Sequence, residues 1–298
     1  MKSRSLIMLL LVAAFACGLL IVSAQEPGDE VRGAFLSTRP KTTNRNAASR
    51  RRRSRNTNSS SVTAKNANST AANANRSGNK NNFVANKPSQ AIGLGYTLFM
   101  REAGGREVRV EPSREFHNGD SVRIALEPNV DGYLYVFHTE SDGAPEMLYP
   151  DWRLDGGENW IEAHVPIEVP SSEETDERLR WFTFYGNAGI ERLYVVVSRE
   201  ALAAVPSGDR LVTFCAANKD KCPWRPSSVV WAKIQDATKA DVKVVAARSF
   251  GQALSEKERI ATTRGLGLDQ TAPEPSVIRM NASTNAPVLV TVLDLIHK

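Results

Sequence analysis

The four histidines of this 298-residue chain, His117, His138, His164 and His297, are the side chains best suited to move a proton near neutral pH. His138 ends an apolar segment, and His164 stands two positions after Glu162. The chain contains no Gly-x-Ser-x-Gly elbow, no His-Glu-x-x-His pair, no phosphate-binding loop and no calcium-loop spacing. A single histidine at a strand end is usually structural. We therefore assign no catalytic residue and expect the protein not to be an enzyme.

Cysteine is the second residue type that could do chemistry. Cys215 and Cys222 are separated by six residues, and Cys17 lies in an apolar N-terminal segment. The spacing does not match a redox-active Cys-x-x-Cys, and a metal site would need further ligands that are not evident nearby. In an exported protein a pair of this kind normally forms a bridge. We predict a disulfide between Cys215 and Cys222, no metal site and no cofactor.

Acidic turn residues and aromatic residues are the remaining candidates for ligand contact. Aspartate is common in turns because of its local hydrogen bonds, so its presence there does not by itself indicate a site. If such residues converged at one end of the fold, they could bind calcium, flank a sugar or form the pocket of a hydrolase. The aromatic residues could form a platform for carbohydrate, although packing is their commoner role. The candidate ligand-binding residues are Asp131, Asp142, Tyr149, Trp152 and Trp160.

The first 24 residues have the pattern of a secretory signal peptide. Lys2 and Arg4 precede an apolar run from Leu6 to Val22, and small residues follow, so cleavage is expected after Ala24. Two alternatives remain open. Cys17 could be acylated in a lipoprotein-type sequence, or the run could be retained as a membrane anchor, for which 17 residues is the short limit. Each alternative still implies export, to the periplasm or the cell surface.

A basic segment follows, which we delimit as residues 25–90. Between Glu26 and Gln90 there are thirteen Lys and Arg residues and three acidic ones, a net charge of +10. Because the whole chain carries +5 and Lys2 and Arg4 add +2, Ala91 to Lys298 carries −7. The segment is rich in Asn and Ser and poor in large apolar residues, which predicts a disordered linker.

The linker contains one concentrated basic cluster, and two interpretations of it remain open. It is either a solvated tether or a contact for anionic envelope polymers and membrane surfaces. Behind a signal peptide, nucleic acid is not an expected partner. The cluster consists of Arg50, Arg51, Arg52, Arg53 and Arg55.

Residues 91–298 have the pattern of a β-rich domain. Polar and apolar residues alternate over Val122–Leu126, as in a strand with one wet face, whereas Tyr133–Phe137 is apolar on both faces and should lie inside a covered sheet. Other short strand patterns, separated by turn signals, favour an antiparallel β-sandwich-like fold. They lie at 96–100, 108–110, 147–150, 160–166, 180–185 and 193–197.

The C-terminal third, 204–298, adds a few short helices. We expect one helical turn at Arg199–Ala204, a helix around Val229–Ile234 behind a Ser cap, and another opened by the capping box Ser255–Glu258. Strands are expected at 242–245 and at 288–293. A strand so close to the C-terminus should pair back into the main sheet. This favours one domain with an elaborated C-terminal third over two independent domains.

Several short motifs in this body, taken in order, resemble the bacterial domain of unknown function 4384. They are Phe116-x-x-Gly119-Asp120-x-Val122-Arg123, Asp131-Gly132-Tyr133-Leu134-Tyr135-Val136-Phe137, Asp142-Gly143, Leu148-Tyr149-Pro150 and Glu191-x-Leu193-Tyr194-Val195-Val196-Val197-Ser198. The resemblance covers about 116–203. It implies a β-rich, often envelope-associated module that elsewhere accompanies kinase or peptidase domains, and it carries over no catalytic residue.

The sequence therefore predicts an exported bacterial envelope protein that acts as a non-catalytic binding or structural module. Its partner would be a protein or an envelope polymer, with membrane-surface contact through the basic cluster. The alternative is a carbohydrate- or small-ligand-binding protein that uses the turn aspartates and the aromatic residues. A third class, an envelope hydrolase, would require Asp or Glu side chains to meet in a pocket.

Overall fold

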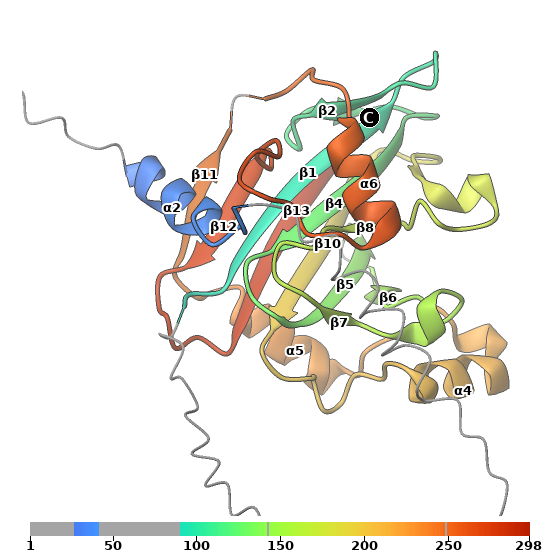
Figure 1. Ribbon diagram of the computed structural model, residues 1–298. Helices are drawn as coiled ribbons and strands as arrows, with labels where there is room; N and C mark the ends of the chain where they lie inside the picture. The colour runs from blue at the N-terminus through green and yellow to red at the C-terminus, as the bar shows by residue number, and fades with distance from the viewer. Residues whose placement is uncertain (1–26, 42–89, 142, 248) are drawn as a thin grey trace, which may run out of the picture.

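Two β-sheets packed face to face form the centre of the molecule (Figure 1). The computed structural model describes residues 27–41, 90–141, 143–247 and 249–298. Helices cover the outer faces of both sheets, so the described chain has four layers. The predicted mainly β, antiparallel sandwich-like class with short helices in the C-terminal third is confirmed.

The first sheet, sheet A, has seven strands in the order β11-β12-β1-β4-β8, with β2 also pairing with β1 and β9 with β4. All its pairings are antiparallel. β1 is central because it pairs with β4 along most of its length on one side, and with β12 and then β2 on the other. The strands are β1 (Gly93–Arg101), β2 (Glu107–Val110), β4 (Ser121–Pro128), β8 (Ile167–Val169), β9 (Phe182–Thr183), β11 (Val242–Ala246) and β12 (Val277–Asn281).

The second sheet, sheet B, has six strands in the order β3-β13-β10-β5-β6, with β7 also pairing with β5. β3 pairs in parallel with β13, and the other pairings are antiparallel. The C-terminal strand β13 therefore lies inside the sheet, as its sequence pattern predicts. The strands are β3 (Glu115–Phe116), β5 (Gly132–Glu140), β6 (Glu146–Tyr149), β7 (Trp160–Ile161), β10 (Gly189–Ser198) and β13 (Val288–His297).

Strand β5 is covered on both faces, as its doubly apolar sequence predicts. Leu134 and Val136 point into the core between the sheets, and Tyr135 and Phe137 point into a second cluster on the outer face of sheet B. Neighbouring β10 follows the same rule through its run of β-branched residues, which pack well on a pleated surface. The two clusters hold the sheet-B helices and the sandwich together.

Helices α4 (Asp209–Ala217) and α5 (Ser228–Ala237) cover the outer face of sheet B. Helices α2 (Pro27–Leu36) and α6 (Glu256–Arg264) belong to the sheet-A side, where Figure 1 draws α2 beside β11 and β12 and α6 in front of β1 and β4. Short 3-10 turns η1 (Asp155–Gly157), η2 (Glu177–Arg180) and η3 (Lys219–Lys221) occur in the connections. None of the helices in the described part of the chain combines the length and apolar composition needed to span a membrane.

Local capping explains where two of the helices begin. Ser227 accepts a hydrogen bond from the Val230 amide at the start of α5. Ser255 and Glu258 form the predicted capping box of α6, in which each side chain bonds the other residue's backbone amide. Both helix starts expected from the sequence are therefore confirmed.

Two local predictions are wrong, and a third is confirmed only in part. The predicted linker contains helix α2, because Val31 and Phe35, four positions apart, form an apolar face that packs on sheet A. The expected helical turn at Arg199–Ala204 is absent from this described segment, where the chain leaves β10 through a bend and turn. The segments 160–166 and 180–185 form strands of only two residues each, β7 and β9. The remainder of the predicted linker, 42–89, lies outside the described residues.

Candidate functional site

The five predicted ligand-binding residues have different partners. The Asp131 carboxylate accepts a hydrogen bond of 2.8 Å from the Ala163 amide, which is a turn-stabilising role. Tyr149 packs partly into the core between the sheets, and Trp152 packs against the cluster on the outer face of sheet B. Asp142 lies outside the described residues. The geometry thus assigns structural work to three of the five.

Trp160 is the exception, because 47% of its surface is exposed. It lies on β7 directly opposite Tyr133 of β5, and the two rings meet edge to face with centroids 5.1 Å apart. An exposed indole supported by a second ring is an arrangement that can stack against a sugar or a peptide. The predicted polyanion-contact residues Arg50, Arg51, Arg52, Arg53 and Arg55 lie outside the described residues.

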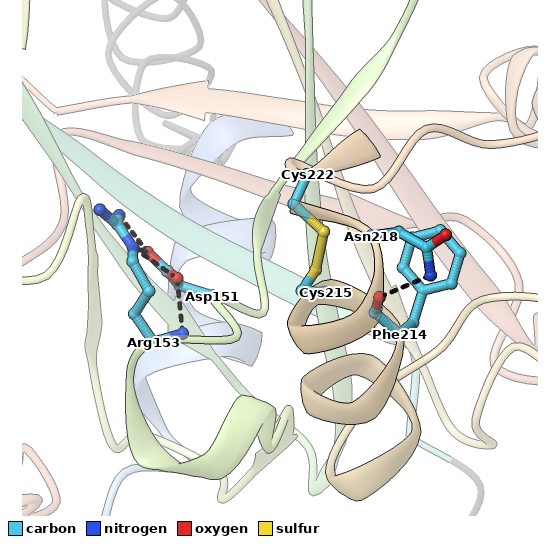
Figure 2. The surroundings of a disulfide bond; sticks show 6 residues. All are labelled: Asp151, Arg153, Phe214, Cys215, Asn218 and Cys222. Atoms are coloured by element: carbon cyan, nitrogen blue, oxygen red, sulfur yellow. Dashed lines mark hydrogen bonds and ion pairs between the residues drawn. A yellow bond between two sulfur atoms is a disulfide. The ribbon is translucent and has the colours of Figure 1, made fainter. Parts of the chain in front are cut away.

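The predicted disulfide joins Cys215, which is fully buried on α4, to Cys222 just after η3 (Figure 2). Asn218 lies inside the loop that the bridge closes, and its side chain donates a 2.9 Å hydrogen bond to the Phe214 carbonyl at the end of α4. Figure 2 also shows Arg153, whose guanidinium donates several hydrogen bonds to the Asp151 carboxylate. These hydrogen bonds raise the pKa of Arg153. The bridge and these bonds hold the surface loops in place.

A surface hollow of about 260 Å³ lies directly beyond the disulfide. Two aromatic side chains, Phe214 and Trp224, contribute to its lining, and charged residues of both signs surround them. Its wall is tied to sheet B, because the Met147 amide of β6 donates a 2.8 Å hydrogen bond to the Trp224 carbonyl. We call this feature the disulfide hollow; it is lined by Phe214, Asp220, Lys221, Cys222, Pro223, Trp224 and Arg225.

The outer face of sheet A carries a different kind of site, a layer of buried charges. Arg123 of β4 pairs with Glu168 of β8 at 3.1 Å, and its guanidinium lies 4.0 Å from the centre of the Trp181 ring. Arg109 of β2 pairs with Glu258 of α6. An unpaired buried charge is costly. The two ion pairs therefore hold β8, which carries Glu168, and α6, which carries Glu258, against the sheet.

Glu127 of β4 belongs to the same layer of buried charges, and it begins a series of three hydrogen-bonded side chains. Its Oε1 lies 2.7 Å from Nδ1 of His164, and Nε2 of the same imidazole lies 2.7 Å from the Thr38 hydroxyl. A carboxylate, an imidazole and a hydroxyl in this order are the parts of a hydrolytic triad. The sequence alone did not indicate this arrangement. Glu162 is the acidic residue nearest to His164 in the sequence, whereas its hydrogen-bond partners Glu127 and Thr38 lie in distant segments.

Two observations argue against a catalytic role for the three side chains Glu127, His164 and Thr38. The Thr38 hydroxyl donates to the Phe35 carbonyl at 2.6 Å, so its proton is directed away from the imidazole that would have to remove it. Arg39 occupies both carboxylate oxygens of Glu127, at 2.8 and 2.7 Å. Burial would raise the pKa of Glu127, but hydrogen bonds from His164 and Arg39, with their charges, lower it below its ordinary value. The carboxylate therefore stays ionised near neutral pH and anchors the residues that bind it.

The backbone at His164 supports the same interpretation. His164 has a φ of 59°, a left-handed conformation that is costly for a residue with a Cβ. Its amide donates to the Pro128 carbonyl and its carbonyl accepts from the Leu268 amide, which holds the strained turn. Backbone strain of this kind persists only where several contacts fix it. Over the ranges that the structure describes, no group of three or more His, Cys, Asp and Glu side chains is placed to hold a metal ion.

The comparisons with known proteins agree with the resemblance read from the motifs. The model of one family matches residues 115–201. This segment contains β3 to β10 but lacks β1, β12 and β13, which lie between or beside its strands in the two sheets. No curated protein and no solved structure matches the chain. The matching model is that of the family described as Domain of unknown function (DUF4384).

Proposed function

We propose that this protein is an exported, non-catalytic binding module of the bacterial cell envelope, and that the disulfide hollow is its binding site. The observation that carries the proposal is the hollow itself. It is concave, has a volume of about 260 Å³, and is lined by two aromatic rings and by charged side chains. Binding sites for small ligands and polymer segments combine concavity, aromatic surface and a few polar groups in this way.

Export rests on two independent features. The basic residues and apolar run at the N-terminus have the order of a secretory signal. The Cys215–Cys222 bridge requires an oxidising compartment to form and persist. The compartment proposed is the periplasm or the cell surface.

The ligand proposed is an envelope polymer or protein segment with both a flat apolar surface and polar groups. Trp224 and Phe214 offer rings for stacking, and Lys221 and Asp220 offer a donor and an acceptor at the rim. The disulfide pre-organises this wall, so little conformational entropy is lost on binding.

A second candidate function is carbohydrate binding around Trp160 on β7. The exposure of Trp160 and its edge-to-face contact with Tyr133 favour it. This version does not require the hollow.

Co-sedimentation with isolated envelope material tests both candidates. The purified protein should sediment with the material, Trp224→Ala should not, and Trp160→Ala should behave as wild type. Loss of binding in Trp160→Ala alone would support the second candidate. Near-UV circular dichroism controls for folding. Release of soluble fragments from the polymer by the purified protein would contradict the non-catalytic proposal.

A further inference from the structure

We infer that sheet A carries a second binding site, a groove for a helical peptide ending in Thr-Arg, and that the chain's own residues 27–41 are its resident ligand. This inference is independent of the proposed function at the disulfide hollow. We call the site the α2 groove. Its walls are contributed by Gly93, Gly95, Glu127, His164, Val245, Asp269, Ala272, Pro273, Ile278 and Met280.

The groove is shaped for the Phe35 ring, which is completely buried. Gly93 and Gly95 stand two positions apart on β1, so they share one face of the strand. A Cβ added at Gly93 would meet the Phe35 ring at 3.0 Å, and one added at Gly95 would meet it at 3.1 Å. The strand therefore lacks side chains where the ring lies. The His164 ring closes the slot edge-on, 5.3 Å from the Phe35 ring.

Arg39 provides the polar half of the recognition. Only 2% of it is exposed, and its guanidinium makes two parallel bonds to Glu127. The remaining donors reach the carbonyl oxygens of Asp269, Ala272 and Pro273, at 3.5, 3.0 and 3.1 Å. This is a complete set of partners for a planar, five-donor group. Lysine could not reproduce it.

Hydrogen bonds to the backbone of the segment add to these contacts. The Gln270 amide donates to the Pro40 carbonyl at 3.1 Å, and the Gln270 side chain donates to the Arg39 carbonyl at 3.3 Å. The contact thus combines an aromatic anchor, a buried arginine and backbone bonds. These features are typical of the energetically dominant centre of a protein–peptide interface.

The connection to the rest of the chain is what makes this segment comparable to a separate ligand. Residues 42–89, 48 in number, stand between the segment and the described start of the body at Gln90. A connection of this length reaches up to about 160 Å when fully extended, so it does not dictate where the segment binds. Its position is set by the groove contacts, and a second copy or another chain with the same features could bind there too.

Cutting the connection tests the inference with the whole chain from Gln25 onward. A protease recognition sequence is inserted after Ala64, the folded protein is cleaved, and the product is passed over a gel-filtration column at low micromolar concentration. The N-terminal fragment should co-elute with the body. An excess of synthetic peptide 27–41 should displace it. The body of the cleaved Arg39→Ala protein, collected free of its fragment, should keep its near-UV circular dichroism.

Two arginine variants of the cleaved protein supply matched controls. Arg39→Ala should weaken retention of the fragment roughly 100-fold or more, because Glu127 would lose its buried partner. Arg32→Ala removes an arginine of helix α2, in the same segment, whose side chain is 34% exposed and pairs with Asp29 and Glu274 at the surface. It should change retention by no more than about fivefold.

Three results would overturn the inference. The wild-type fragment could separate from the body on the column. The two arginine variants could weaken retention equally, which would mean that the recognition is unspecific. The body of the cleaved Arg39→Ala protein could lose its tertiary structure when it is freed of the fragment, which would make residues 27–41 part of the core rather than a ligand.

Discussion

Arg39 and Glu127 lie 88 positions apart in the chain and meet in a doubly hydrogen-bonded ion pair that is almost completely buried. Glu127 belongs to the central part of sheet A, whereas Arg39 follows a helix near the N-terminus. His164 binds the same carboxylate from a third segment. This relationship fixes the N-terminal segment on the body, and the first two predictions depend on it.

Arg39→Ala should detach helix α2 without unfolding the sandwich. Breaking a buried pair on one side costs about 3–5 kcal/mol, and the buried apolar face of the helix itself consists of Val31 and Phe35. Hydrogen exchange should report amide protection in α2 reduced by roughly 100-fold or more, with protection in β10 unchanged. Equal loss in both elements would mean that α2 is not an independent unit.

The attachment of α2 should weaken in acid. The pKa of Glu127 in the folded protein lies below its ordinary value of 4.5, so the ionised carboxylate contributes stability that is fully present above pH 4.5. That contribution is lost as the pH falls through the lowered pKa. The measurement is α2 protection by hydrogen exchange from pH 7 down to pH 3, for wild type and Glu127→Gln.

The difference between these two proteins should be constant above pH 4.5 and shrink below it. Glu127→Gln serves as the control because other carboxylates titrate in both proteins. A difference independent of pH throughout the range would show that Glu127 does not hold the segment through its charge.

Two glycines of α2 should respond in opposite ways to alanine. A Cβ at Gly28 would lie 2.6 Å from a Val245 methyl group, so Gly28→Ala should loosen the helix. Nothing lies within 4 Å of a Cβ at Gly33, so Gly33→Ala should stabilise α2 by about 0.5–1 kcal/mol through helix propensity alone. Amide protection in α2 measures both. Stabilisation by both substitutions would contradict the packing of α2 against β11.

Reduction of the Cys215–Cys222 bridge should cost about 2–3 kcal/mol, as expected for a short loop whose two cysteines have a sequence separation of 7. It should also loosen the wall that carries Trp224 and so weaken envelope binding. Urea unfolding and co-sedimentation, each with and without reductant, measure the two effects. Undiminished binding by the reduced protein would separate the hollow from the proposed function.

The sandwich was accessible from the sequence because its strands carry their own signals. The doubly apolar β5 and β10 predicted a covered sheet, and the alternation in β13 predicted that the chain returns to it. The caps Ser227 and Ser255 are local patterns that need no tertiary information. The length of short strands such as β7 was overestimated. Where such a strand ends depends on the neighbouring strands and not on its own sequence.

The α2 groove could not be predicted in the same way. Helix α2 has a weak apolar face within a stretch whose overall composition is that of a linker, and only the spacing of Val31 and Phe35 indicated it. Glu127 and His164 depend on pairing between distant segments, which no local pattern encodes. The same is true of the disulfide hollow, where the cysteine spacing predicted the bridge but not the position of Trp224.

The most direct test of the central claim is photo-crosslinking in intact cells that export the protein. A photoreactive amino acid replaces Phe214, which lines the hollow, or Arg264, an exposed residue of α6 on the sheet-A side. We expect one discrete envelope component to be crosslinked from position 214. The same adduct should be absent from position 264, and it should be lost from position 214 when Trp224→Ala is added. The same adducts from both positions, or none from position 214, would contradict this expectation.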